Sequence, residues 1–428
     1  MKSYLKMSAA ELAAEKNKLD AEFADIKAKN LSLDMSRGKP SAQQLDISMG
    51  MMDVLSSSSD LKCDGVDCRN YGILCGITDA KALLAAMSEV SVDNVIIYGN
   101  SSLNVMYDTV ARSYTHGVLG STPWCKLDKV KFLCPVPGYD RHFAITEFFG
   151  IEMINVPMLE TGPDMDMVEK LVSSDPAIKG IWCVPKYSNP QGITYSDETV
   201  LRFANLKPAA EDFRIYWDNA YCVHHLYDDD QDYLIEILDA CTKAGNPDMV
   251  YKFCSTSKIS FPGSGIAALA ASTANIEEIK KQLTIQTIGH DKLNQLRHVR
   301  FYGDMDGIVK HMKKHADILR PKFEMVCDTL DSELGSLEIG SWIKPKGGYF
   351  VSFDSLPGCA KAIVAKCKEA GITLTGAGAT YPYGKDPKDT NIRIAPSFPT
   401  TSELEMAMKV FTLCVKLASC EKLLAEKA

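Results

Sequence analysis

The sequence of 428 residues lacks the patterns that mark several classes of protein. No two of its 14 cysteines form a CxxC pair, so neither a zinc site nor a disulfide framework is indicated. We expect these cysteines to be buried as small apolar residues in a reducing compartment. No apolar run approaches the roughly 20 residues that span a bilayer, and residues 1–6 contain no signal-peptide core. These absences predict a cytoplasmic protein without a membrane partner.

The chain also has fewer basic than acidic residues. The chain has 47 lysines and arginines against 55 aspartates and glutamates, which gives a formal net charge of -8. A nucleic-acid partner would require a basic face, so this charge argues against one. The sequence also contains no internal repeat and no low-complexity linker. It does contain 46% hydrophobic residues, over a length that exceeds one ordinary domain and can bury large cores.

The most informative stretch surrounds Lys258. The apolar run 248–254 predicts a strand, and Ser255, Ser257 and Lys258 follow it directly. Hydroxyl groups at the end of a strand offer donors for an anion, and a lysine amine beside them can form a Schiff base. The combination is typical of enzymes that use pyridoxal phosphate.

Two upstream motifs fit the same cofactor. Asp218 ends the apolar run 213–217, which predicts a buried strand of a parallel sheet, and ligands bind at the carboxyl ends of such strands. A carboxylate there can keep the pyridine nitrogen of pyridoxal phosphate protonated. The amide of Asn189 and the hydroxyl of Tyr221 can donate hydrogen bonds to the phenolic oxygen of the ring.

The phosphate and the face of the ring need further partners. Residues 95–102 form a short apolar strand, a glycine turn and two serines before a stretch that predicts a helix. Backbone N–H groups at a helix start bind phosphate well. Tyr139 lies in a loop rich in proline and glycine, and we expect its ring to stack on the pyridine. The residues expected to hold the phosphate are Asn100, Ser101, Ser102, Ser255 and Ser257.

In chain order, these motifs and a late arginine resemble the pyridoxal-phosphate-dependent class I aminotransferases of the aspartate aminotransferase fold. The resemblance spans nearly the whole chain, and residues 33–45 and 291–301 are similar to a bacterial subgroup of aspartate aminotransferases. It implies that Lys258 forms the Schiff base and carries the proton from the substrate α carbon, with Asp218 and Tyr221 assisting catalysis. It also implies a ping-pong reaction of amino-acid and keto-acid substrates, with L-aspartate and 2-oxoglutarate converted to oxaloacetate and L-glutamate.

The resemblance extends to the substrate site and to the assembly. Arg393 matches the arginine that binds the substrate α-carboxylate, and Gly38 matches a glycine whose backbone approaches the same group. Tyr71 resembles a tyrosine that reaches the phosphate of the neighbouring subunit, which implies a homodimer with shared active sites. Ile266 stands where many members carry an arginine, so hydroxyls, backbone donors or another cation must hold the phosphate here.

A dicarboxylic substrate needs a second cation. We favour Arg141, because it lies two residues beyond Tyr139 in a loop that already belongs to the site. A surface arginine paired with Asp140 or Glu147 explains the position equally well. The rival cations are Arg37, Lys39, Lys292, Arg297 and Arg300.

The pattern of elements agrees with an α/β fold of the aspartate aminotransferase type, also called pyridoxal phosphate fold type I. Short apolar strands alternate with helical stretches over 51–319, which predicts a large cofactor-binding domain with a mainly parallel, mixed sheet. Residues 1–50 and 320–428 are expected to form a smaller α+β domain that closes over the substrate. Within it, Ser8 and Glu11 predict a capping box for a helix over 8–30.

Other functions compete with this interpretation. Residues 263–268 fit G-x-G-x-x-A, the pattern of dinucleotide oxidoreductases, but it occurs late in the chain and chance explains it better. A regulator fused to a DNA-binding module would need room and basic charge that the chain lacks. A lyase on the same fold stays open, as does a transaminase for aromatic amino acids or kynurenine. His311 and His315 are spaced to chelate a metal, but flanking lysines favour a solvated helix face and no metal.

Overall fold

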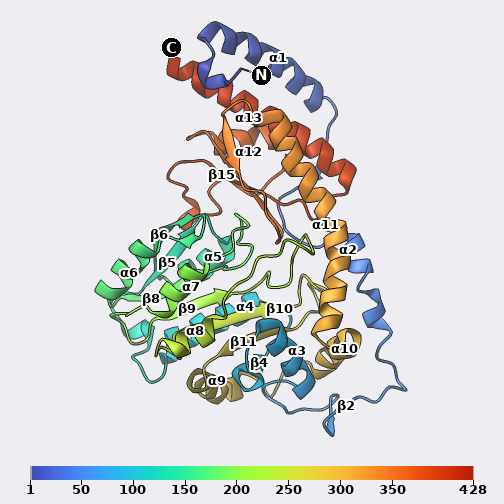
Figure 1. Ribbon diagram of the computed structural model, residues 1–428, viewed down its shortest axis with the longest axis vertical. Coiled ribbons are helices and arrows are strands. Elements are labelled where there is room, and N and C mark those ends of the chain that lie inside the picture. Colours follow the sequence, from blue (N-terminus) through green and yellow to red (C-terminus); the bar gives the residue numbers. More distant parts are fainter. Residues whose placement is uncertain (1, 428) are drawn as a thin grey trace.

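The computed structural model describes residues 2–427, and an eight-stranded sheet lies in the lower part of the view in Figure 1. The strands from β10 to β6 run parallel, whereas β11 and β7 run antiparallel to their neighbours. The mainly parallel, mixed sheet expected from the sequence is therefore confirmed. In spatial order the strands are β4 (Val95–Ile97), β11 (Ala267–Ala271), β10 (Val250–Ser255), β9 (Arg214–Asp218), β8 (Ile178–Cys183), β5 (Lys131–Val136), β6 (Glu152–Leu159) and β7 (Gly162–Pro163).

Both faces of this sheet are buried. Successive side chains of a strand point to opposite faces, so Trp182 and Tyr216 enter one apolar core while their neighbours Ile181 and Ile215 enter another. Helices α4, α5 and α9 cover the first face and helices α6, α7 and α8 the second. Burial on both faces explains why these strands are continuous apolar runs. The helices around the sheet are α3 (Thr78–Ser88), α4 (Ser102–His116), α5 (Asp140–Phe148), α6 (Met165–Ser174), α7 (Asp197–Ala204), α8 (Ile237–Lys243), α9 (Thr273–Gln286) and α10 (Lys292–Tyr302).

A second, antiparallel sheet lies at the other end of the molecule, beside the two chain termini (Figure 1). Its strands are β12 (Gly340–Trp342), β13 (Val351–Ser355) and β15 (Asn391–Ile394), in that order. Helices α1 (Ala9–Lys27), α12 (Ala360–Glu369) and α13 (Thr401–Lys427) share its core. The long helix α11 (Met305–Leu334) passes from the large sheet to this second core (Figure 1). The domain bounds given above remain a prediction.

The N-terminal segment joins both parts of the fold. The capping box expected at the start of α1 is present, since Ser8 Oγ accepts from the Glu11 amide at 3.2 Å and Glu11 accepts from the Ser8 amide at 2.7 Å. The segment then pairs in parallel with the C-terminal part, through β1 (Leu33–Asp34) and β14 (Ile372–Thr373). The short helix α2 (Ala42–Asp46) and the hairpin of β2 (Lys62–Cys63) and β3 (Val66–Asp67) precede α3.

The segment 346–350 directly precedes β13 and does not extend this strand, which starts at Val351. The backbone of Lys346 and Gly348 bonds instead to Leu226 and His224, in the loop after β9. These bonds tie the second sheet to the carboxyl edge of the first.

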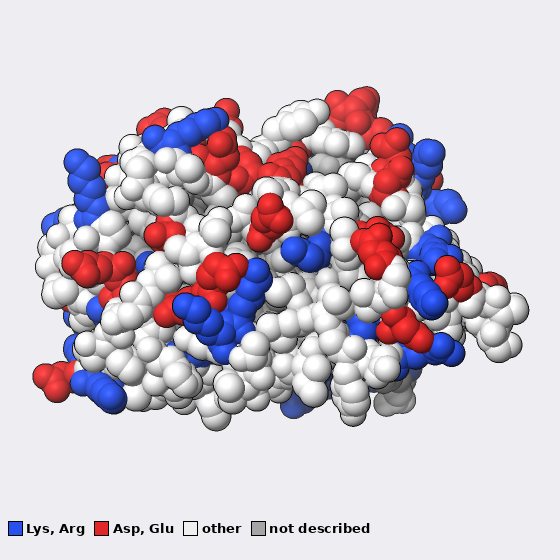
Figure 2. Space-filling model, turned by 90° about the horizontal axis from the view of Figure 1, so that it is seen from below, with Lys and Arg blue, Asp and Glu red and all other residues white. Residues whose placement is uncertain are grey.

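Charges of both signs are mixed on the surface of the protein. Figure 2 shows acidic and basic side chains interspersed in small groups over the face that is seen from below. Within residues 2–427, no helix is both long enough and apolar enough to span a membrane.

The solvated face expected for His311 and His315 is wrong, because both side chains are buried. They lie on the side of α11 that faces the loop after β10, while Lys310, Lys313 and Lys314 lie exposed on the helix surface. The Nε2 atoms of both histidines donate to the carbonyl oxygen of Ile259, at 2.9 and 3.0 Å. The lysines that flank them in sequence therefore gave no guide to their environment.

Side chains from helices α2 and α10 also form hydrogen bonds around the loop that carries Lys258. The amide of Gln44, in α2, donates to Nδ1 of His315 at 3.0 Å, which leaves the proton of the neutral ring on Nε2. From α10, His298 Nε2 accepts from Thr256 and Ser260 hydroxyls at 3.1 and 2.9 Å. Buried imidazoles thus bond the loop through the hydroxyls of Thr256 and Ser260 and through the backbone carbonyl of Ile259.

We expect acid to destabilise the protein partly through His315. Burial is the main cause that lowers its pKa in the folded state to about 3, so between about pH 6.5 and about pH 3 only the unfolded chain takes up this proton. The free energy of unfolding should fall with pH over this window, by up to about 1.4 kcal/mol per pH unit from this residue. His315→Gln keeps a donor for Ile259 but cannot titrate. Its thermal midpoint should therefore drop less than the wild-type midpoint between about pH 7 and about pH 5.

The exposed His116, in the last turn of α4, provides the matched control. His116→Gln should keep the wild-type pH dependence of the thermal midpoint. An equal drop in the His315→Gln and wild-type proteins would show that His315 is not a source of the acid sensitivity.

Candidate active site

Asp218 lies at the end of β9, at the carboxyl edge of the parallel strands, and is buried. Its Oδ2 atom accepts from Nε2 of His142 at 2.9 Å, and the His142 ring stacks on Trp182 with 4.4 Å between centroids. The other carboxylate oxygen, Oδ1, is buried and has no hydrogen-bond partner among residues 2–427. Burying a carboxylate oxygen without a donor is costly, so this atom fits the N–H group of a ligand.

Sequence reasoning did not assign a role to His142. It lies three residues after Tyr139, at a helix start, and residues three apart on a helix lie on one side. The two rings meet edge to face, with 4.9 Å between centroids. A histidine at this spacing from the proposed stacking aromatic was the signal available in the sequence.

Lys258 lies in the turn between β10 and β11, and its amine is within reach of the same residues. Its Nζ atom donates to the Tyr221 hydroxyl at 3.2 Å and lies 4.5 Å from the centroid of that ring. Burial lowers the pKa of Lys258; the negative charge of Asp218 opposes this effect and the charge of Arg393 adds to it. An amine with a lowered pKa loses its proton more readily, as a nucleophile or base must.

The two tyrosines of the site keep their protons. Burial raises the pKa of Tyr139 to about 12, and burial likewise raises the pKa of Tyr221 above its usual value. The Tyr221 hydroxyl therefore remains a hydrogen-bond donor at neutral pH. A third tyrosine, Tyr349, was not expected from the sequence. Its ring packs beside Tyr221, 6.0 Å between centroids, and its hydroxyl donates to the Lys258 carbonyl at 3.4 Å.

Arg393 extends from β15 of the second sheet and is largely buried. Its Nη1 atom donates to Asp140 Oδ1 at 2.9 Å and to Asn189 Oδ1 at 3.1 Å. Its Nη2 atom is 3.4 Å from the Thr375 hydroxyl, and Nε is buried without a partner among the described residues. Asp140 was expected, if anything, beside Arg141, so its pairing with Arg393 is a finding of the structure.

Gly38 reaches the same place from the N-terminal segment. The guanidinium carbon of Arg393 lies 4.7 Å from the centroid of the Phe350 ring. A Cβ atom at Gly38 would overlap that ring, so the close approach of this backbone requires glycine. The structure therefore brings Gly38 and Arg393 to one aromatic side chain.

The residues proposed for the phosphate meet at the start of α4. The carbonyl of Asn100 accepts from the hydroxyls of Ser255 and Ser257, at 3.2 and 2.7 Å. Ser101 is the N-cap of α4, with its hydroxyl accepting from the Leu103 amide at 3.2 Å, and Ser102 is the first helical residue. Hydroxyls and free backbone N–H groups thus gather where an anion is favoured by the helix dipole.

Ile266 and Arg297 bear on the charge of this phosphate site. Ile266 is buried in the core between α3 and the sheet, and its backbone pairs with Thr256. Arg297, from α10, donates instead to the Ser264 hydroxyl and to Asn294. Arg297 is therefore a cation beside the loop of Ser264 and Gly265. This loop comes close to Ser257, because a Cβ atom at Gly265 would lie 3.1 Å from the Ser257 nitrogen.

The structure does not bring Arg141 to this group. Its side chain is exposed in the first turn of α5, and no hydrogen bond or ion pair within residues 2–427 ties it to Lys258 or Arg393. Of the rivals, Arg37 is exposed, and Lys39 lies over the Phe398 ring at 3.8 Å. Lys292 and Arg300 donate to backbone carbonyls of the segment 60–72. The second cation remains a prediction.

Tyr71 also lies apart from the other site residues. Its side chain is 83% exposed, in the segment between β3 and α3. Most tyrosines of the chain are far less exposed, and so large an exposed ring suits a contact with another molecule.

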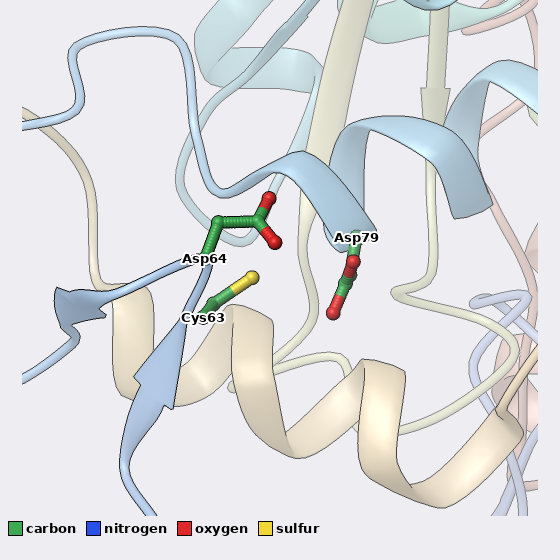
Figure 3. Close-up of side chains that lie close together, drawn as sticks. All are labelled: Cys63, Asp64 and Asp79. Atoms are coloured by element: carbon green, nitrogen blue, oxygen red, sulfur yellow. The ribbon is translucent and has the colours of Figure 1, made fainter.

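A small group of potential metal ligands occurs far from these residues. Cys63 and Asp64 come from the β2–β3 hairpin and Asp79 from the start of α3, with their ligand atoms within 4.8 Å of one another (Figure 3). Both aspartates are exposed, and burial raises the pKa of the Cys63 thiol, which disfavours the thiolate that a metal needs. Three such groups form no closed coordination shell, and we assign the group no role.

Comparison with known proteins agrees with this site. The family model for aspartate amino-transferases matches residues 7–427. The aspartate aminotransferase of Corynebacterium glutamicum is 46% identical over 402 residues, 94% of this chain and 92% of the relative. A provisionally named aminotransferase of Mycolicibacterium smegmatis is 47% identical over 428 residues, 99% of this chain and all of the relative.

Solved structures extend the comparison to the fold. An aspartate transaminase from Corynebacterium glutamicum superimposes with a TM-score of 0.95, at 45% identity over 98% of this chain and 99% of its own. The α-aminoadipate aminotransferase LysN of Thermus thermophilus, solved with N-(5'-phosphopyridoxyl)-L-leucine, shares only the fold, with a TM-score of 0.73 and 18% identity over 92% of this chain and 93% of its own. The chain therefore belongs to the aspartate aminotransferase family and is an enzyme of the aspartate transaminase type.

Proposed function

We propose that this aminotransferase uses pyridoxal phosphate to convert L-aspartate and 2-oxoglutarate to oxaloacetate and L-glutamate in a ping-pong reaction. The observation that carries the proposal is the buried Asp218 carboxylate, which bonds to His142 through one oxygen and keeps the other free. A pyridinium N–H is the donor that such an oxygen fits. The likeness to an aspartate aminotransferase at 46% identity supports the choice of substrates.

The residues of the site suit each part of the cofactor. Asp218 would hold the ring nitrogen and Tyr139 the face of the ring, while Asn189 and Tyr221 would bond the phenolic oxygen. The phosphate would lie at the start of α4, where helix N–H groups and hydroxyls are available. The residues proposed there are Asn100, Ser101, Ser102, Ser255 and Ser257.

The chain's own residues then perform the transfer. Pyridoxal phosphate, when bound, supplies an electron sink for the bonds of the substrate α carbon. Lys258 would hold the cofactor through its amine, and the same amine, when free and with its lowered pKa, would accept the proton from the substrate α carbon. Its bond to the Tyr221 hydroxyl restrains Nζ while this proton is held. In the second half-reaction, 2-oxoglutarate would bind to the same residues, and the steps of the first half-reaction would run in reverse.

Arg393 would bind the substrate α-carboxylate as a planar fork. Its nearest present partner is the Asp140 carboxylate, at 2.9 Å, which the substrate would have to replace. Asn189, bonded to the same nitrogen, would keep the guanidinium plane in position during this exchange. For the side-chain carboxylate we propose Arg141, the chain neighbour of Asp140, with Arg297 as the runner-up.

We also propose a homodimer in which Tyr71 reaches the phosphate of the partner subunit. The exposure of its ring supports a contact with another molecule. The cytoplasmic location expected from the sequence stays a prediction.

Lys258→Ala tests the proposed function directly. The rate of oxaloacetate formation from L-aspartate should fall at least about a thousandfold, because the variant loses both the amine and the proton carrier. The exposed Lys281→Ala, on α9, is the matched control and should keep the wild-type rate. Near-normal turnover by Lys258→Ala would sink the mechanism.

Asp218→Asn removes the charge and keeps the shape of the side chain. We expect cofactor affinity to weaken and turnover to fall at least about a hundredfold, because the negative charge beside the ring nitrogen is lost. Equilibrium dialysis of pyridoxal phosphate measures the first effect and a steady-state assay the second. Unchanged values for both would remove the role assigned to Asp218.

Arg141→Ala distinguishes the cations. If Arg141 binds the side-chain carboxylate, KM for L-aspartate should rise about tenfold or more, while KM for L-alanine should change little. Arg297→Ala, assayed with the same two amino acids, is the comparison. A selective rise in the Arg297 variant alone would move the assignment to Arg297.

A further inference from the structure

A cavity is lined in part by the chain segment that follows Asp218. It has a volume of about 270 Å³ and is enclosed by α3, the loop 228–236, the start of α11 and the segment after β9. The chain neighbours of Asp218 and Tyr221, namely Asn219 and Cys222, line it. Asp218, Tyr221, Lys258 and the other residues proposed for the cofactor do not. The cavity is therefore separate from the reaction centre but shares a chain segment with it.

Lys186 is the one lysine of this cavity wall without a carboxylate partner among residues 2–427. Lys252 pairs with Glu236 at 2.8 Å, and Lys313 pairs with Asp228 at 3.2 Å. The amine of Lys186 donates to the backbone carbonyl of Cys222 at 3.1 Å, and no described carboxylate lies within 4.0 Å of it. Burial lowers the pKa of this amine. A partly buried ammonium without a counterion favours an anionic ligand group.

Asn219 contributes a hydrogen-bond acceptor to the same cavity. Its side chain is 7% exposed, and Oδ1 is buried without a donor among the described residues. Its backbone N–H already donates to the Phe253 carbonyl at 2.8 Å. Buried amide oxygens are nearly always bonded, so this atom fits an N–H group of a ligand. Glu89, exposed at the end of α3, lines the same cavity and forms no ion pair within residues 2–427.

The rest of the wall is mixed, with apolar side chains beside the carboxylates of Asp228, Asp232 and Glu236. Three methionines, Met87, Met305 and Met312, line it together with Val309 and Leu234. Methionine side chains adapt to apolar groups of different shape. The cavity thus combines an anion site, an acceptor for N–H groups and apolar side chains.

We propose that this cavity binds a free α-amino acid with an apolar side chain. The carboxylate would pair with Lys186, the ammonium would donate to Asn219 Oδ1 near Glu89, and the side chain would contact the methionines. The proposal concerns binding alone and does not depend on which amino acid the enzyme converts. A ligand here would contact Asn219 and Cys222, and through them the segment that holds Asp218 and Tyr221.

Calorimetric titration of the holoenzyme with L-leucine and L-phenylalanine tests this proposal. Lys186→Met should weaken binding about tenfold or more, because the carboxylate loses its only free cation. Ala86→Phe, at an exposed position of the cavity rim, should also block binding. Arg393→Ala removes the proposed carboxylate site of the reaction centre and should leave this binding event in place. The melting temperature and the transamination rate of Lys186→Met should stay at wild-type values, which excludes a folding defect.

Two results would overturn the proposal. One is the absence of binding by the wild-type holoenzyme with both amino acids. The other is binding that disappears in Arg393→Ala and persists in Lys186→Met, because the reaction centre would then be the only site. The acid 4-methylpentanoate, which is leucine without its ammonium group, should bind more weakly than leucine. Equal affinity for the two would remove the role of Asn219.

Discussion

The buried carboxylate of Asp218 is the constraint on which the site depends. A carboxylate taken out of water must be bonded or paired, and here the hydrogen bond to His142 meets half of that need. His142 is fixed in turn by the flat face of Trp182, from the neighbouring strand β8. The acid therefore sits at the centre of the large sheet with its remaining oxygen oriented by the fold. Burial is also the main cause of the lowered pKa of Lys258.

Hydrogen bonds from buried side chains hold the loop that carries Lys258 in place. His298 accepts from the hydroxyls of Thr256 and Ser260, which flank Lys258, and His311 and His315 donate to the backbone carbonyl of Ile259; all three histidines are buried. Supporting residues of this kind determine how accurately a reactive group is placed. Because Gln44 bonds both His315 and Tyr349, the N-terminal segment is part of the same support. A change in that segment would reach Lys258 through two hydrogen bonds.

The sequence predicted the elements and the polar residues at strand ends better than it predicted partners. Continuous apolar runs and hydroxyls at their ends are local signals, and β9, β10 and the Asp218 and Lys258 positions follow from them. The prediction of a solvated face for His311 and His315 was wrong, because the local pattern of lysines does not show which face of a helix packs against another element. The bond between Arg393 and Asp140 joins residues 253 positions apart, and no local pattern indicates such a contact. Arg141 was favoured by its neighbourhood in the chain; its side chain is exposed at the start of α5, and its role stays a prediction.

The pairing of Arg393 with Asp140 has a consequence for selectivity. If Arg393 binds the substrate α-carboxylate as proposed, an arriving substrate exchanges one anion for another, because Asp140 already neutralises the guanidinium, and it gains little from charge alone. What it can gain is geometry, because a carboxylate on a free molecule can meet the planar guanidinium squarely while Asp140 reaches it through a single nitrogen. Monatomic anions such as chloride, which lack that shape, would then compete poorly for Arg393.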